Sequence, residues 1–248
     1  MAIVRLKTPT YETVMSSDSP KIILFDIDGT LLTCRGAGQL AMEAALSDVF
    51  DLQPPFQNIP CAGRTDRGIG SSIFQTFQKE DSHENRIQFR DSYLKHLPTY
   101  LTQQKATLLP GIAALLDALK DDSRIKLSLL TGNYEVAARI KLQHFGLQQR
   151  FQGGVFGDNH ADRDRLAIDA VQQFSKAYGK QLSGQNFLIV GDTPADIQCA
   201  AAINASVIAV ATGIHDQHVL AKAKPDAVLP HFSDTQQTVD AIQSLLIS

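Results

Sequence analysis

The chain has 248 residues, of which 44% are hydrophobic and 20% are charged, and its formal net charge is −3. These values are typical of a soluble globular protein, and without a block of like charge they argue against nucleic acid or an anionic membrane as the main partner. No apolar run is long enough to span a membrane, no secretory signal is apparent, and the three cysteines have no metal-like spacing, so we expect a cytoplasmic protein.

The first predicted strand is followed at once by two carboxylates. Four apolar residues, 22–25, precede Asp26 and Asp28. Such a run is typical of a strand that is covered on both faces of a parallel α/β sheet, where the chemistry lies beyond the carboxyl ends of the strands. The two acids predict a metal site, a nucleophile with an acid/base partner, or both. A calcium-binding loop is disfavoured because Gly29 stands fourth, not sixth, and a plain turn at the strand end remains the alternative.

Residues 36–107 have apolar positions that suit helices only, with no convincing strand. Prolines interrupt the middle of this stretch. The simplest interpretation is a small helical insertion after the first strand, with the α/β domain resuming near Leu108. An insertion at the carboxyl end of a strand can cover a site there and exclude water.

After residue 108 predicted strands alternate with predicted helices. Strands are expected at 125–130, at a run ending near Phe156, and at 187–190, 206–211 and 226–229. Helices are expected at 111–120, 134–145, 163–178, 194–203 and 235–247, and the apolar positions of the second of these are Val136, Ile140 and Phe145. This alternation indicates βαβ units and a right-handed parallel sheet. We therefore predict an α/β fold with a doubly wound parallel sheet.

Three further polar segments follow predicted strands. They are Thr131-Gly132-Asn133, the segment 191–196 and the segment 157–165. In a parallel sheet all of these strand ends open at the same edge, together with Asp26 and Asp28. Taken singly, residues 131–133 could be a turn or a helix cap. Residues 192–194 could be an N-cap followed by a proline in the first turn of a helix.

Together these segments contain the parts of a metal-assisted phosphoryl transfer. Asp26 and Asp192 could hold a hard divalent cation such as Mg²⁺, which takes one or two carboxylates with phosphate oxygens and waters. Thr131 and the amides of Gly132 and Asn133, at a helix start, offer a pocket for a phosphate. The set thus favours a phosphorylated substrate.

The remaining groups could carry the reaction itself. A carboxylate can be the nucleophile that accepts the phosphoryl group. Asp28 can protonate the leaving oxygen and later deprotonate water. A cation near Arg163 would balance the charge that spreads over the transferring group.

The segments 26–31, 131–133 and 191–196, in this order, resemble the haloacid dehalogenase-like (HAD) hydrolase superfamily in its phosphatase branch, and the pattern is similar to that of phosphoglycolate phosphatases. The resemblance implies a Rossmann-like catalytic core formed by residues 1–35 and 108–248. It also implies that residues 36–107 are the α-helical cap domain of that family.

The resemblance also implies roles for the acids. Asp26 would be the nucleophile that forms an aspartyl-phosphate. Asp28 would be the general acid/base, and its backbone carbonyl would bind Mg²⁺ together with Asp26 and Asp192. Asp196 would be a supporting acid behind the metal ligands or an occasional ligand itself.

For the phosphoryl group, the resemblance implies binding by Thr131 with help from Gly132 and Asn133. The family usually has a Lys or Arg before the final acidic motif, often as Lys-Pro, and this chain has no such pair there. Arg163 is our choice for that cation, and Arg165 is the alternative.

The implied activity is an Mg²⁺-dependent phosphatase acting on a small phosphorylated metabolite, such as a sugar phosphate, a nucleotide or phosphoglycolate. A phosphomutase of the β-phosphoglucomutase type is the alternative within the superfamily, a metal-free dehalogenase is disfavoured, and a catalytically idle binding protein is the alternative outside enzymes. The loop 63–66 is either a flexible loop or a cap loop that touches substrate, in which case Arg64 could meet a second anionic group.

Overall fold

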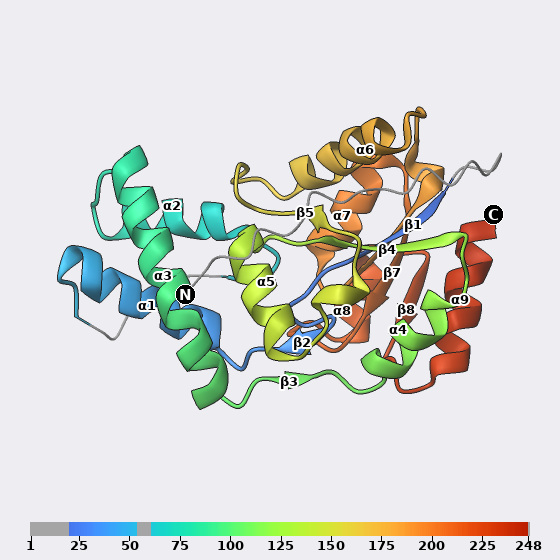
Figure 1. The fold of residues 1–248 in the computed structure, drawn as a ribbon, viewed down its shortest axis with the longest axis horizontal. Coiled ribbons are helices and arrows are strands. Elements are labelled where there is room, and N and C mark those ends of the chain that lie inside the picture. The colour runs from blue at the N-terminus through green and yellow to red at the C-terminus, as the bar shows by residue number, and fades with distance from the viewer. Residues whose placement is uncertain (1–19, 54–60, 248) are drawn as a thin grey trace.

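The computed structural model describes residues 20–53 and 61–247 (Figure 1). Parts of the two predicted units, residues 1–19 and 54–60, therefore lie outside the described residues. Within the described part of the chain, no helix has both the length and the apolar character needed to cross a membrane.

A six-stranded sheet forms the centre of the molecule, and all of its neighbouring strands are parallel. Its strand order is β5-β4-β1-β6-β7-β8. The strands are β1 (Lys21–Phe25), β4 (Ile125–Leu130), β5 (Gly154–Val155), β6 (Phe187–Gly191), β7 (Ser206–Val210) and β8 (Ala227–Leu229). The predicted doubly wound α/β fold is thus confirmed, with β1 near the middle of the sheet.

Helices cover both faces of this sheet because its central strands are apolar on both sides. Along β1, Ile23 and Phe25 belong to one hydrophobic cluster, and Ile22 and Leu24 belong to the other. The first cluster includes side chains of α4 (Ile112–Lys120), α5 (Glu135–His144) and α9 (Thr235–Ile247). The second includes side chains of α6 (Asp164–Tyr178), α7 (Pro194–Ile203) and α8 (Gln217–Lys222). Successive residues of a strand point to opposite faces, which produces this division.

Three helices lie together at one end of the molecule, and we call them the α1–α3 bundle (Figure 1). They are α1 (Ala37–Phe50), α2 (Asp66–Thr76) and α3 (His83–Gln103). The chain enters and leaves the bundle through two short antiparallel strands, β2 (Leu32–Thr33) and β3 (Thr107–Leu108). Buried apolar side chains of the bundle belong to the same hydrophobic cluster as α5, and α5 lies between the bundle and the sheet (Figure 1).

The structure differs from the sequence predictions at several places, and the short strand β2 was not predicted. Thr107 begins β3, within the stretch for which we predicted helices only. Helix α8 was not predicted. On α5 the predicted apolar face is wrong at Val136, which is 47% exposed, because the helix instead buries Ala137, Ala138, Lys141 and Leu142.

Candidate active site

Three adjacent strands in the middle of the sheet place polar side chains at one edge. Asp26 directly follows β1, Thr131 follows β4 and Asp192 follows β6. Because β4, β1 and β6 are neighbours and parallel, their carboxyl ends meet. The structure therefore brings together residues that lie far apart in sequence, as expected for parallel α/β sheets.

Three carboxylates form a compact cluster at this edge. Asp26, Asp192 and Asp196 each place an oxygen within 4.8 Å of the others, and all three side chains are buried. Burial raises the pKa of Asp26 to about 6, although Arg163 pulls in the opposite direction. Burial and the charges of Asp196 and Asp26 raise the pKa of Asp192 to about 8. Mutual repulsion of this kind would be relieved by a cation held among the carboxylates.

Arg163 is the cation that faces this cluster. Its Nη2 atom lies 3.0 Å from Oδ2 of Asp26 and 2.5 Å from Oδ1 of Asp196, and its side chain is only 7% exposed. Arg163 stands at the N-cap of α6, where a positive charge opposes the helix dipole. The two carboxylates compensate for that position. Arg165, the alternative candidate, is exposed.

Asp196 also holds the loop that carries Asp192. Its Oδ2 accepts hydrogen bonds from the backbone N–H of Thr193, at 3.0 Å, and from the Thr193 hydroxyl, at 2.8 Å. These contacts form a capping box at the start of α7, with Pro194 in the first turn. The predicted N-cap and the acidic cluster therefore coexist at this loop.

Two glycines allow the backbone to approach Asp192 closely. A Cβ atom at Gly29 or at Gly213 would overlap the Asp192 carboxylate. Thr30 donates a hydrogen bond of 3.1 Å to Oδ1 of Asp192. Thr212, in the loop after β7, donates one of 2.6 Å to the carbonyl oxygen of Gly29. This loop was not part of the predicted site.

Asp28 points away from the carboxylate cluster, toward the loop after β4. Its Oδ2 accepts hydrogen bonds from Nζ of Lys141 at 2.6 Å and from Nδ2 of Asn133 at 2.8 Å. Nδ2 of Asn133 also donates to Oγ1 of Thr131 at 2.8 Å. A continuous hydrogen-bonded chain thus joins the predicted acid/base residue to the predicted phosphate-binding hydroxyl.

The charge of Lys141 dominates the electrostatics around Asp28. Partial burial raises the pKa of Asp28, but the Lys141 ammonium and the hydrogen bonds from Lys141 and Asn133 outweigh it, so the pKa lies below its usual value. Burial alone would lower the pKa of Lys141, but the Asp28 carboxylate keeps it well above its usual range. Each group of the pair thus favours the charged form of the other.

The α1–α3 bundle contacts the phosphate-binding loop directly. The backbone N–H of Asp66 donates to the carbonyl oxygen of Gly132 at 2.7 Å, and a Cβ atom at Gly132 would overlap the backbone of Arg64. Thr65 accepts a hydrogen bond from the Gly68 amide and donates one to the Ala161 carbonyl. The loop 63–66 therefore packs on the site edge, and Nη2 of Arg64 donates to the Gly68 carbonyl and to Ser72 of α2.

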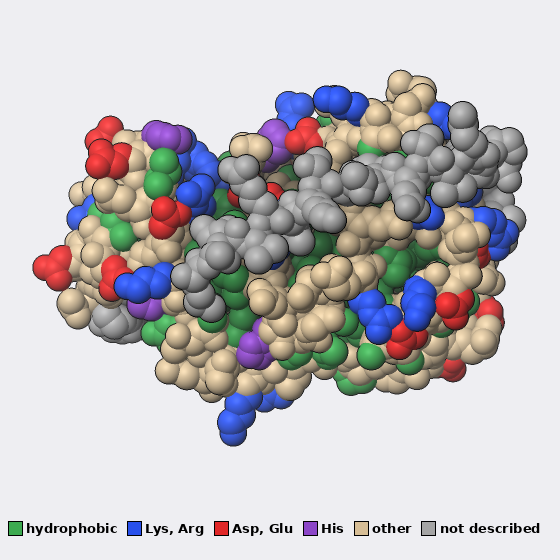
Figure 2. Space-filling view, viewed as in Figure 1, with side chains coloured by type: hydrophobic (Ala, Val, Ile, Leu, Met, Phe, Trp, Pro, Cys, Tyr) green, Lys and Arg blue, Asp and Glu red, His purple; other side chains and the backbone are tan. Residues whose placement is uncertain are grey.

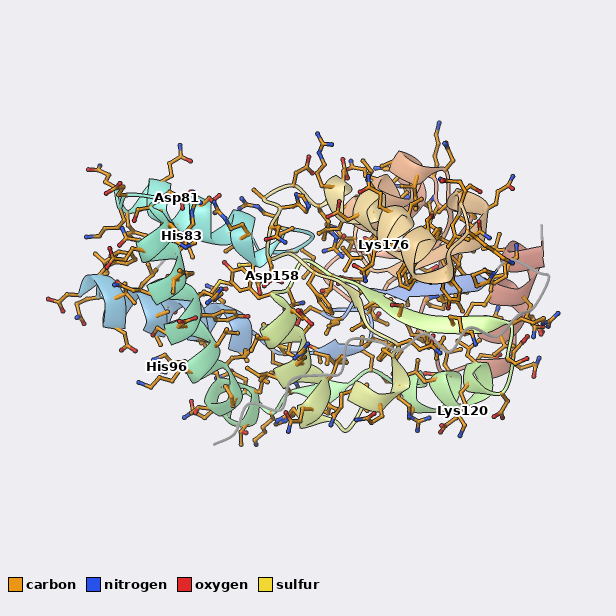
Figure 3. All side chains as sticks on the ribbon, turned by 45° about the horizontal axis from the view of Figure 1, so that its top comes forward. Asp81, His83, His96, Lys120, Asp158 and Lys176 are labelled. Atoms are coloured by element: carbon orange, nitrogen blue, oxygen red, sulfur yellow. The ribbon has the colours of Figure 1, made fainter. Side chains whose placement is uncertain are left out.

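The amides of Tyr134 and Glu135, next to the residues predicted to bind phosphate, are already engaged. Asp66 accepts from the Tyr134 amide at 2.9 Å, and Asp158 accepts from the Glu135 amide at 2.8 Å. Figure 3 shows Asp158 where the bundle meets the rest of the molecule. These carboxylates satisfy the first turn of the helix, and the residues predicted to bind phosphate, 131–133, lie just before it.

Sequence reasoning missed Lys141, Thr30 and Gly213. Lys141 had a recognisable signal, because it shares one helix face with Ala137, Ala138 and Leu142, and a lysine in an apolar stripe is unusual. Our assignment of the apolar face to Val136 hid it. Thr30 lies in the segment 26–31, but nothing in the sequence indicated its contact with Asp192. The contact of Gly213 with Asp192 was likewise not indicated by any sequence pattern.

The side chains present fit a hard divalent cation. Carboxylate oxygens are the ligands that Mg²⁺ prefers, and the cluster offers three. Asp26, Asp28, Asp192 and Asp196 oppose only two buried cations at this edge, Arg163 and Lys141, among the described residues. A divalent ion would balance that difference.

The sequence and the fold are similar to those of known proteins. A sequence model of the haloacid dehalogenase-like hydrolase family matches residues 23–210. The chain is 25% identical over 229 residues to the pyrophosphatase PpaX of Bacillus pumilus, covering 92% of this chain and 100% of PpaX. It is 27% identical over 213 residues to a phosphoglycolate phosphatase of Rhodospirillum rubrum, covering 78% and 80% of the two chains. The crystal structure of a predicted phosphatase from Clostridium acetobutylicum superimposes with a TM-score of 0.68 at 19% identity, covering 92% of this chain and all of the other.

Proposed function

Because this chain belongs to the haloacid dehalogenase-like hydrolase family and is an enzyme of its phosphatase branch, we propose that it is an Mg²⁺-dependent phosphatase. Its substrate would be a small phosphorylated metabolite, and the reaction would proceed through an aspartyl-phosphate. The main support is the position of Asp26, which lies among the buried carboxylates and 3.0 Å from Arg163, two residues before Asp28.

In the first step a carboxylate oxygen of Asp26 attacks phosphorus. The bond between phosphorus and the leaving oxygen breaks, its electron pair stays on that oxygen, and Asp28 as the acid gives it a proton. In the second step a water oxygen attacks the phosphorus of the aspartyl-phosphate while Asp28 takes a proton from the water. The bond between phosphorus and Asp26 then breaks, and inorganic phosphate leaves.

Asp26, Asp192 and the backbone carbonyl of Asp28 would hold the metal, with Asp196 in support. When bound, Mg²⁺ neutralises negative charge and orients the phosphate group. Arg163 supplies a fixed positive charge beside the nucleophile.

Thr131, Gly132 and Asn133 would bind the phosphoryl oxygens next to Asp28. We further propose that residues 36–107 act as a cap over a core of residues 1–35 and 108–248. Two observations support this: loop 63–66 packs on Gly132, and the outline of the molecule is notched between the α1–α3 bundle and the rest (Figure 2). In this arrangement Arg64 would approach a second anionic group of the substrate.

The proposal is tested with p-nitrophenyl phosphate and a panel of phosphorylated metabolites in the presence of Mg²⁺, by measuring released phosphate. We expect turnover by the wild type, loss of turnover with EDTA, and a fall of more than about 1000-fold for Asp26→Asn. Asp240→Asn, at an exposed position on α9, is the matched control and should keep wild-type activity. Turnover that survives in Asp26→Asn would contradict the proposed nucleophile.

A mutase would use the same residues but return the phosphoryl group to substrate. ³¹P NMR of the reaction with a sugar phosphate separates the two activities, because a phosphatase releases inorganic phosphate and a mutase yields an isomer. We expect inorganic phosphate.

A further inference from the structure

A buried lysine contacts the acid/base carboxylate. Lys141 lies on α5, and its side chain is 5% exposed, whereas that of Asp28 is 40% exposed. Nζ of Lys141 lies 2.6 Å from Oδ2 of Asp28 and 2.5 Å from Oδ1 of Asn133. The ammonium group is therefore shielded within the protein, and the carboxylate it holds faces the more open side.

The groups found around the Asp28 carboxylate are hydrogen-bond donors. Lys141 and Asn133 donate to Oδ2, and Sγ of Cys34 donates to Oδ1 at 3.0 Å. A carboxylate that is surrounded by donors is held as an acceptor, with its orientation fixed from two sides. Asn133 is itself fixed by Lys141 and by Thr131.

The position of Lys141 on its helix makes this contact unusual. Its neighbours on the buried face are Ala137, Ala138 and Leu142, so an apolar side chain would suit the packing there. Burying an ammonium group costs free energy, and well-packed apolar residues in place of a whole buried ion pair are often as stable as the pair. Packing therefore gives no reason for a lysine at this place, whereas the contact with Asp28 does.

We propose that Lys141 is a positioning residue for the second half of the reaction. It holds the Asp28 carboxylate as the acceptor of the proton that leaves water while the water oxygen forms its bond to the phosphorus of the aspartyl-phosphate and the bond from phosphorus to Asp26 breaks. This role rests on the proposed function. Lys141 itself touches neither the substrate nor the transferring group, and acts through Asp28 and Asn133.

The test uses p-nitrophenyl phosphate, because p-nitrophenolate leaves without needing a proton. Formation of the aspartyl-phosphate from this ester should then be nearly independent of Lys141. Hydrolysis of the aspartyl-phosphate, in contrast, should depend on Lys141. In Lys141→Met we expect kcat to fall about 10- to 100-fold, as is typical when a residue that orients a functional side chain is lost. We expect kcat/KM to stay within about threefold of wild type, since it reports the steps up to release of p-nitrophenolate.

Stopped-flow measurement supplies the second readout. Lys141→Met should release a burst of one p-nitrophenolate per enzyme before a slow steady state, as the phosphorylated enzyme accumulates. Lys141→Arg keeps the positive charge and should retain a larger share of kcat. Lys176→Met, which removes an exposed lysine on α6 on the side of the molecule away from the bundle, is the matched control and should show wild-type kcat (Figure 3).

Equal losses in kcat and kcat/KM with no burst would overturn the proposal, because a purely structural role lowers both through the fraction of active enzyme. If Lys141→Met does not fold, as judged by its melting curve, Lys141→Gln offers the same comparison with a neutral donor, and the same burst is expected. If the wild type hydrolyses the ester but neither variant shows a burst, only the proposed role of Lys141 is refuted. If the wild type hydrolyses no phosphate ester, the proposed function is refuted as well.

Discussion

Arg163 makes an ion pair of 3.0 Å with Asp26, although 136 residues separate them in the chain. Arg163 is the N-cap of α6 on one face of the sheet, and Asp26 directly follows β1 near the middle of the sheet. The same guanidinium reaches Asp196 at the start of α7. One buried cation therefore ties the proposed nucleophile to the loop of the carboxylate cluster.

Replacement of Arg163 should lower kcat much more than replacement of Arg165. Arg163→Met is expected to lower kcat by about 100- to 1000-fold, the range found when a preorganised group that stabilises the transition state is removed. It should also lower the free energy of unfolding, because it leaves two buried carboxylates without their partner. Arg165→Met is the matched control and should stay within twofold of wild type, since Arg165 is exposed. Activity is measured with p-nitrophenyl phosphate on protein whose folding has been verified by thermal melting, and equal effects of the two variants would refute the assignment of Arg163.

The stability of the protein without Mg²⁺ should fall as the pH rises. Asp26 and Asp192 have folded-state pKa values of about 6 and about 8, against 3.8 for the unconstrained carboxyl. A raised pKa means that folding favours the protonated form, so the stabilising contribution is complete below about pH 4 and is lost as the pH passes the folded-state pKa values. In EDTA the melting temperature should therefore decrease between pH 5 and pH 8, by roughly 5 °C or more.

Mg²⁺ should reverse this decrease. A cation among the ionised carboxylates stabilises the folded state by mass action, so its effect on the melting temperature should be larger at pH 8 than at pH 5. Asp192→Asn removes the group with the higher pKa and should flatten the pH profile in EDTA. A wild-type melting temperature that is equally insensitive to pH with and without Mg²⁺ would show that the cluster does not bind the metal.

Gly29 and Gly36 form a matched pair for the close approach at Asp192. Their φ angles are +82° and +84°, so alanine should cost about 1–2 kcal/mol of strain at either position. Only at Gly29 would the added Cβ overlap the Asp192 carboxylate, whereas at Gly36 it would meet nothing within 4 Å. Gly29→Ala should therefore lose more than about 100-fold in kcat/KM and need more Mg²⁺ for half-maximal activity, while Gly36→Ala keeps both near wild type. Similar kinetics for the two variants would mean that the contact with Asp192 is unimportant.

Much of the fold could be predicted from local patterns. Consecutive apolar residues before Asp26, Thr131 and Asp192 indicated buried strands, and a parallel sheet requires such strands to open at one edge. The grouping of these three residues followed from topology alone, without knowledge of any contact. Their chemical roles remain predictions that the experiments above address.

The tertiary structure decided which lysine and arginine side chains lie at the site. Asp162-Arg163-Asp164-Arg165 offers two similar arginines in sequence, and only the orientation of the first turn of α6 buries Arg163 and exposes Arg165. Lys141 and Asp28 lie 113 residues apart, and their contact depends on which face α5 turns inward. The periodicity of a short helix with small alanines does not fix that face, because Ala137 and Ala138 pack inward while the larger Val136 stays exposed. The sequence by itself determined the positions of the buried strands along the chain and the acids that follow them, since both depend on neighbouring residues. Helix rotation and long-range pairing of charge depend on packing between distant segments, and only the folded structure could show them.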